Sequence, residues 1–176
     1  MKLLRLFIGC VAVPISLATA DAQQGKPNFI VVFCDDLGYA DIGPFGSKTH
    51  ATPVLDKMAK EGMRLTDFYS TCSVCTPSRS SLMTGCYPRR VNMHVDEKNL
   101  CVLFPAASKG LNPSEITIAE ILKEQGYATM CIGKWHLGAF DREMAGPHAQ
   151  VMPPWKAGFE ECFSTFNVLV THDPYA

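Results

Sequence analysis

A short apolar run, Asn28 to Cys34, stops abruptly at two adjacent acids, Asp35 and Asp36. The run is rich in Val, Ile and Phe and does not alternate with polar residues. Such runs suit a central strand of a parallel sheet, because a strand of that kind is covered on both faces. The sequence therefore predicts a buried strand whose carboxyl end carries two carboxylates.

A helix and a second strand are predicted next. Thr52 precedes Pro53, and apolar residues then recur at helical spacing until Gly62. An N-cap, a proline at the first helical position and a terminal glycine mark a short helix. Residues 63–69 have the composition of a second strand.

A second helix and a third strand follow further along the chain. Thr117 and Glu120 have the spacing of a capping box, which predicts a helix that Gly126 ends. Residues 127–132 are again short, apolar and strand-like. The order of strands and helices predicts an α/β domain with a mostly parallel sheet.

The first 24 residues have the pattern of a cleaved signal peptide. Lys2 and Arg5 precede an apolar run over residues 6–18, and small residues follow it. A membrane anchor is a weaker interpretation, because a spanning helix needs roughly 20 apolar residues and this run contains Pro14. We therefore expect export to a periplasm or the cell exterior, without a stable membrane span.

The charges are balanced, with 16 Lys and Arg against 17 Asp and Glu. No overall field directs such a protein to nucleic acid or to an anionic membrane. Of eight cysteines, seven remain once Cys10 leaves with the signal peptide. Oxidising compartments permit disulfides, but spacing does not reveal which cysteines pair.

Three candidate sites follow predicted elements at the sheet edge where α/β proteins bind ligands. The first is Asp35 and Asp36, whose carboxylates would repel each other without a cation. Hard oxygen ligands suit Ca²⁺ or Mg²⁺. For the dipeptide alone, a helix cap plus a solvated acid is the preferred interpretation.

The second site is the segment around Cys75. Thr76 is expected to cap a helix that begins at Pro77 and ends at Gly85, which places Cys75 at the helix N-terminus. The positive end of a helix favours an anion, and Arg79 lies one turn further on. The segment thus predicts an anionic substrate or intermediate.

Cys72 and Cys75 also form a C-x-x-C pair. A redox site would need a thioredoxin-like context, and a zinc site would need a second ligand pair, which neither Cys86 nor Cys101 supplies. Two buried structural cysteines are a third interpretation. The local pattern leaves all three open.

The third site follows Gly133. If the chain stays extended there, Lys134 and His136 are two residues apart and point to the same side. A cation and an imidazole would then face one place. For this tripeptide alone, a surface lysine and histidine beside a packed Trp135 is the more common arrangement.

Together these segments resemble a known family. Residues 75–85 and 126–136 closely resemble the two signature motifs of the formylglycine-dependent sulfatases, which belong to the alkaline phosphatase superfamily. Residues 31–46 and 51–70 are similar to that family in order and spacing as well. The resemblance spans about residues 28–163.

The resemblance implies an alkaline phosphatase-like fold with helices on both faces of the sheet, and residues 25–176 would be the N-terminal part of a sulfatase catalytic domain. It implies that a formylglycine-generating or anaerobic sulfatase-maturating enzyme converts Cys75 to formylglycine. Asp35, Asp36 and modified Cys75 would hold Ca²⁺ or Mg²⁺. The remaining metal ligands of the family would lie beyond Ala176, so we expect this fragment alone to be inactive.

The same resemblance assigns the other site residues. Arg79 and Lys134 would stabilise the formylglycine diol and developing negative charge, and His136 would act as the base. The substrate would be a sulfated carbohydrate or an aryl sulfate. Two alternatives are a phosphonate or phosphate monoester hydrolase with the same nucleophile, and an inactive exported metal-binding fragment.

Overall fold

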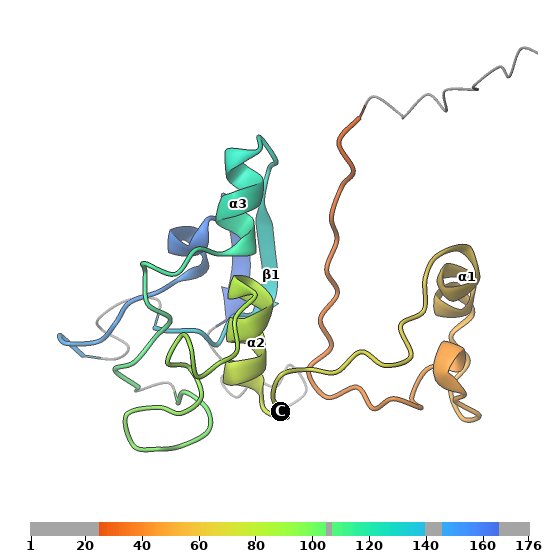
Figure 1. Cartoon of the computed structure of the whole chain (residues 1–176), viewed down its shortest axis with the longest axis horizontal. Coiled ribbons are helices and arrows are strands. Elements are labelled where there is room, and N and C mark those ends of the chain that lie inside the picture. Colours follow the sequence, from red (N-terminus) through yellow and green to blue (C-terminus); the bar gives the residue numbers. More distant parts are fainter. Residues whose placement is uncertain (1–24, 105–106, 140–145, 166–176) are drawn as a thin grey trace, which may run out of the picture. The chain divides into compact units, whose positions relative to one another are not determined.

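The computed structural model describes residues 25–104, 107–139 and 146–165 (Figure 1). The predicted signal peptide lies outside the described residues. The chain divides into two compact units, residues 1–34 and residues 35–176. The elements in chain order are η1 (Gly43–Phe45), α1 (Pro53–Glu61), α2 (Cys75–Thr84), α3 (Ile118–Glu124), β1 (Met130–Lys134), η2 (Pro154–Ala157) and β2 (Glu161–Thr165).

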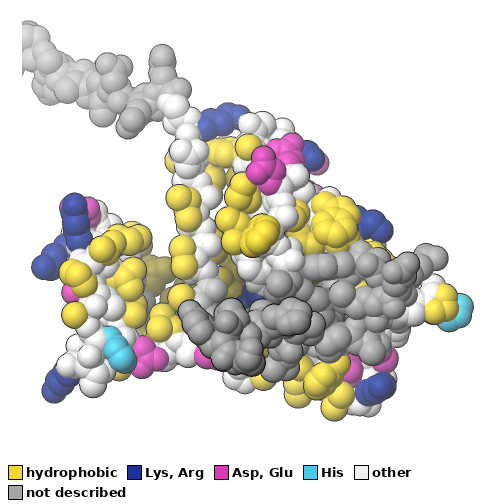
Figure 2. Space-filling model, turned by 180° about the vertical axis from the view of Figure 1, so that it is seen from behind, with side chains coloured by type: hydrophobic (Ala, Val, Ile, Leu, Met, Phe, Trp, Pro, Cys, Tyr) yellow, Lys and Arg dark blue, Asp and Glu magenta, His cyan; other side chains and the backbone are white. Residues whose placement is uncertain are grey.

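The prediction of an opening strand over Asn28 to Cys34 is wrong. The segment forms no strand, and Ile30 and Val32 are 88% and 82% exposed. Figure 2 shows hydrophobic side chains that remain at the surface. A strand exists only where a neighbouring strand pairs with it, and no strand among the described residues pairs with this segment. The apolar pattern therefore has no sheet here in which to be buried.

The predicted first helix is confirmed as α1, whereas the second strand at residues 63–69 is wrong. That segment contains a turn and pairs with no strand among the described residues. Thr52 precedes α1 as expected, but its side chain does not cap the helix. Instead its hydroxyl oxygen accepts a hydrogen bond of 2.8 Å from the Gly43 N–H, which ties η1 to α1.

The capping box that starts α3 is confirmed. The Thr117 side chain accepts from the Glu120 N–H at 3.2 Å, and the Glu120 carboxylate accepts from the Thr117 N–H at 2.8 Å. Thr117 also donates a hydrogen bond of 2.7 Å to the Ala157 carbonyl oxygen. This buried threonine therefore joins the start of α3 to η2.

The strands β1 and β2 form a two-stranded parallel sheet in which Met130 pairs with Glu161 and Lys134 with Thr165. The predicted third strand, residues 127–132, overlaps β1 but begins earlier. The Tyr127 N–H donates back to the Leu122 carbonyl oxygen at 3.1 Å, so the turn after α3 delays the start of the strand. Helices and a parallel sheet make this an α/β fold, as predicted.

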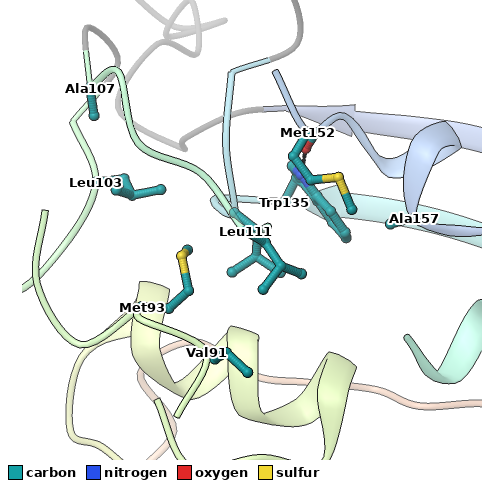
Figure 3. Close-up of a cluster of buried hydrophobic side chains, with 9 residues drawn as sticks. Val91, Met93, Leu103, Ala107, Leu111, Trp135, Met152 and Ala157 are labelled. Atoms are coloured by element: carbon teal, nitrogen blue, oxygen red, sulfur yellow. Dashed lines mark hydrogen bonds between the residues drawn. The ribbon is translucent and has the colours of Figure 1, made fainter. Parts of the chain in front are cut away.

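The hydrophobic core comes from the segments before β1 and from those between β1 and β2 (Figure 3). Its buried members are Val91, Met93, Leu103, Ala107, Leu111, Trp135, Leu137, Met152 and Ala157. The indole N–H of Trp135 donates a hydrogen bond of 2.6 Å to the Met152 carbonyl oxygen. Since Trp135 lies between Lys134 and His136, the core anchors the segment that carries both candidate site residues.

Within the part of the chain that the structure describes, we find no helix that is both long and apolar enough to span a bilayer.

Candidate functional site

Helix α2 presents Cys75 as its first residue. The N-cap is Val74, in an extended conformation with φ −124° and ψ 158°, so the prediction that Thr76 caps the helix is wrong. The predicted end is confirmed, because Gly85 has φ 67° and its N–H donates to the Ser81 carbonyl oxygen at 2.8 Å. Cys75 therefore lies where the positive end of the helix favours an anion.

The Thr76 hydroxyl makes its hydrogen bonds to segments outside α2. The side chain is 1% exposed, and the hydroxyl donates to the His136 carbonyl oxygen at 3.3 Å while accepting from the Leu103 N–H at 3.1 Å. These contacts span 60 and 27 residues of sequence. The residue next to Cys75 thus connects α2 to the segment that follows β1.

A compact cluster of charges forms around Asp35. One carboxylate oxygen of Asp35 lies 2.6 Å from the Arg79 Nη2 atom, and the other lies 2.6 Å from the Lys134 Nζ atom. The Arg79 Nη1 atom also donates to the Lys134 carbonyl oxygen at 2.7 Å. The three side chains together carry a net positive charge of one.

The cluster is partly shielded from solvent. The side chains of Arg79 and Lys134 are 12% and 11% exposed, and that of Asp35 is 31% exposed. Burial acts to raise the pKa of the Asp35 carboxyl, but hydrogen bonds and charges from Lys134 and Arg79 outweigh it, so the pKa lies below the ordinary value of 3.8. Asp35 is therefore ionised throughout the neutral range.

We expect Asp35→Asn to lower the free energy of unfolding of the full-length protein by about 1–3 kcal/mol near neutral pH, because two nearly buried cations lose their counter-ion. A carboxyl with a depressed native pKa stabilises the fold above its unfolded pKa. This contribution disappears as pH falls through the native pKa. The difference in free energy of unfolding between variant and wild type should therefore be constant at neutral pH and shrink below about pH 3.8.

Urea titrations over a range of pH, with chelator present, measure this difference. Asp36→Asn is the matched control, because no ion pair or hydrogen bond of the Asp36 side chain is found among the described residues. An Asp35→Asn variant as stable as wild type at pH 7 would contradict the assignment of a stabilising cluster.

The segment after β1 does not stay extended, so the geometric basis for placing Lys134 and His136 on one side is wrong. Gly133, near the end of β1, already has φ 95°, and His136 after the strand has φ 59°, a left-handed conformation that is uncommon for a residue with a side chain. Even so, the charge of Lys134 acts on His136. The predicted extended geometry therefore does not account for this interaction.

His136 is buried, with 1% exposure, and its Nε2 atom lies at hydrogen-bond distance from the Leu103 carbonyl oxygen. A carbonyl oxygen only accepts, so Nε2 carries the proton and Nδ1 holds the lone pair of the neutral ring. Burial first, and then the charges of Lys134 and Arg79, hold the pKa of His136 below its ordinary value of 6.5. The imidazole is therefore neutral at pH 7 and able to accept a proton.

The residues predicted as metal ligands are only partly assembled. Both carboxylate oxygens of Asp35 are engaged by cations, and no group of three or more His, Cys, Asp or Glu side chains gathers within the described ranges. Carboxylate oxygens have the right chemistry for Ca²⁺ or Mg²⁺, but Ca²⁺ takes 6–8 oxygen ligands. These residues fit part of a metal site.

The seven cysteines after the predicted signal peptide are all free thiols in this structure: Cys34, Cys72, Cys75, Cys86, Cys101, Cys131 and Cys162. Cys72 and Cys75 are half-buried and not bonded to each other. The free thiol of Cys75 is in the chemical state that conversion to an aldehyde requires.

Ion pairs and hydrogen bonds join Asp35, Arg79 and Lys134, and Thr76, the residue after Cys75, is hydrogen-bonded to the backbone of His136. Asp36 makes no described contact with the others. No local signal in the sequence marks the contacts of the Leu103 backbone with Thr76 and His136. The Thr76 hydroxyl, predicted to cap a helix, instead joins two distant segments.

Comparison with known proteins places this site in a family context. A family model described as Sulfatase matches residues 27–174. Steryl-sulfatase of Mus musculus is 48% identical over 121 residues, which cover 69% of this chain and 19% of that protein. Arylsulfatase A of Bos taurus is 43% identical over 140 residues, which cover 80% of this chain and 25% of that protein.

Solved structures agree with the sequence relatives. The crystal structure of Ps i-CgsB superposes with a TM-score of 0.68 at 35% identity, covering 80% of this chain and 28% of that one. A structure described as BT33336S-sulf, from work on glycosaminoglycan metabolism by Bacteroides thetaiotaomicron, has a TM-score of 0.63 at 35% identity, with 80% and 28% covered. The chain thus spans about a fifth to somewhat over a quarter of the length of these proteins.

Proposed function

We propose that this chain, which belongs to the sulfatase family, is part of a sulfuric ester hydrolase that cleaves a sulfate monoester with a formylglycine nucleophile made from Cys75. The observation that carries the proposal is the cluster of Arg79 and Lys134 on Asp35, close to the start of α2. Two cations, one of them on the helix that begins at Cys75, suit an anionic substrate such as a sulfate ester.

The nucleophile comes from the side chain at the first position of α2. After a maturating enzyme oxidises Cys75 to an aldehyde, water adds to give a geminal diol. One diol oxygen attacks the sulfur of the ester, and the alcohol leaves. The second hydroxyl then loses its proton, the carbonyl forms again and sulfate is expelled, so one difficult displacement is divided into two easier steps.

Arg79 and Lys134 stabilise the negative charge that develops during attack. Both side chains are held in place by Asp35, and Arg79 is fixed further by the Lys134 carbonyl oxygen. Donors that are oriented before the reaction contribute most to catalysis, because no reorganisation is needed when charge develops. Asp35 therefore orients both cations before the reaction begins.

His136 takes the proton of the diol hydroxyl during elimination. Its Nε2–H is directed to the Leu103 carbonyl oxygen, so Nδ1 carries the lone pair of the neutral ring. A neutral imidazole at pH 7 has the protonation state that a general base needs.

We propose that Asp35, Asp36 and an oxygen of modified Cys75 contribute to a Ca²⁺ or Mg²⁺ site. The other ligands would come from the portion of the relatives that this chain does not cover. When bound, the ion would make the diol oxygen a stronger nucleophile and screen the negative charge of the sulfate. On this basis the 176-residue chain alone is inactive.

The substrate is proposed to be a sulfated carbohydrate or an aryl sulfate. The names of the relatives refer to steryl and aryl sulfatases, and the structure of Ps i-CgsB is also known in complex with a neocarrahexaose. We further propose that residues 1–24 direct export to the periplasm or the cell exterior, and that residues 25–176 are the N-terminal part of the catalytic domain.

Paired substrates test the function. The full-length protein, produced together with a maturating enzyme, should hydrolyse an aryl sulfate with a higher kcat/KM than the aryl phosphate that has the same leaving group. A preference for the phosphate or a phosphonate ester would move the assignment to a phosphate or phosphonate monoester hydrolase with the same nucleophile. Turnover of neither ester would support an inactive metal-binding protein.

A further inference from the structure

The hydroxyl of Thr76 completes a closed set of three hydrogen bonds. The Leu103 N–H donates to Thr76, and Thr76 donates to the His136 carbonyl oxygen. The ring of His136 in turn contacts the Leu103 carbonyl oxygen. Each of the three residues is 1% exposed, so water does not compete for any of these groups.

The backbone of His136 needs support from its surroundings. A residue with a side chain at φ 59° is strained, and such a conformation persists only where neighbouring groups hold it. The Thr76 hydroxyl holds the carbonyl group of this residue, and the Leu103 carbonyl holds its ring. Together they fix the backbone and the imidazole of the same residue from two directions.

We propose that Thr76 is a positioning residue for the reaction, which holds His136 and Leu103 in register and so fixes the orientation of the imidazole relative to the helix that begins at Cys75. This inference rests on the proposed function. It explains why a buried hydroxyl directly after the nucleophile contacts two segments that are 27 and 60 residues away.

Two substitutions of Thr76 distinguish the effect of its hydroxyl from the effect of its side-chain shape. Thr76→Val has nearly the same shape but leaves the Leu103 N–H and the His136 carbonyl without their partner. We expect kcat per converted Cys75 to fall about 10–100-fold, because a displacement near 1 Å at a reacting group has an effect of that size. Thr76→Ser keeps the hydroxyl and should restore most of the rate.

A second readout is the pKa of His136 in the full-length protein, measured by NMR titration of the imidazole. The Leu103 carbonyl raises this pKa, so loosening that contact in Thr76→Val should lower it and move the acid limb of the kcat profile to lower pH. Thr117→Val is the matched control, because Thr117 is equally buried and donates to the Ala157 carbonyl oxygen away from the site. The Thr117→Val variant should be less stable than wild type but should have the same kcat and the same His136 pKa.

Each measured rate is divided by the fraction of Cys75 that is converted to formylglycine, which mass spectrometry determines. An unchanged His136 pKa together with an unchanged kcat in Thr76→Val would overturn the inference, and Thr76→Ala serves the same comparison if the valine variant does not fold. If the wild-type protein hydrolyses no sulfate ester, the proposed function fails. The NMR titration still decides whether Thr76 positions His136.

Discussion

Replacing Cys75 with alanine in the full-length protein is expected to abolish sulfate ester hydrolysis, with a fall in kcat of about 10⁴-fold or more, as is found when a catalytic nucleophile is removed. Alanine has no group that can be oxidised to an aldehyde. Because Cys75 is only half-buried at the first turn of α2, we expect little change in stability. Steady-state rates and urea titrations measure the two effects separately.

Two further variants show why the cysteine is required. Cys75→Ser is expected to release about one equivalent of alcohol and then stop, because a sulfated serine has no second hydroxyl through which to eliminate sulfate. Cys72→Ala is the matched control and should retain activity. Equal losses from Cys72→Ala and Cys75→Ala would instead favour a function for the C-x-x-C pair and contradict the single-nucleophile mechanism.

Replacing His136 with glutamine is expected to lower kcat about 10²–10⁴-fold, the range that general-base catalysis contributes. Glutamine has no basic nitrogen to accept the diol proton, so elimination becomes the slow step. The first turnover should then appear as a burst of alcohol, followed by a slow steady state. Stopped-flow assays with a chromogenic aryl sulfate measure both phases.

The pH dependence provides a second check on His136. In the wild-type protein, kcat should fall as the imidazole becomes protonated, with an acid limb below pH 6.5 because burial and the nearby cations lower its pKa. His50 is exposed and lies on the loop before α1, so His50→Gln should change neither the burst nor the pH profile. A His136→Gln variant with wild-type kcat would exclude this residue as the base.

Local signals predicted the helices well, because their causes lie within a few residues. The capping box of Thr117 and Glu120 is present, and Gly85 and Gly62 end α2 and α1. The strands were harder, since pairing depends on partners elsewhere in the chain. Residues 28–34 have a strong apolar pattern, but no strand among the described residues pairs with them, so the pattern alone predicts a strand that is not formed.

The site shows the same division between local and distant causes. Asp35 contacts Arg79 and Lys134 across 44 and 99 residues, and the prediction that all three meet came from fold logic and family resemblance rather than from spacing. The geometric reason offered for Lys134 and His136 was wrong, because the chain bends after β1. Thr76 was assigned to a cap because a hydroxyl at a helix start commonly serves there.

The most direct test of the central claim is the mass of the peptide that contains Cys75. The full-length protein is expressed with a formylglycine-generating or anaerobic maturating enzyme and digested, and the peptide is then sequenced by mass spectrometry. We expect the mass that results when the CH₂–SH group of Cys75 is replaced by an aldehyde or its hydrate. A peptide with only an unmodified thiol at Cys75, in protein that hydrolyses sulfate esters, would contradict this expectation.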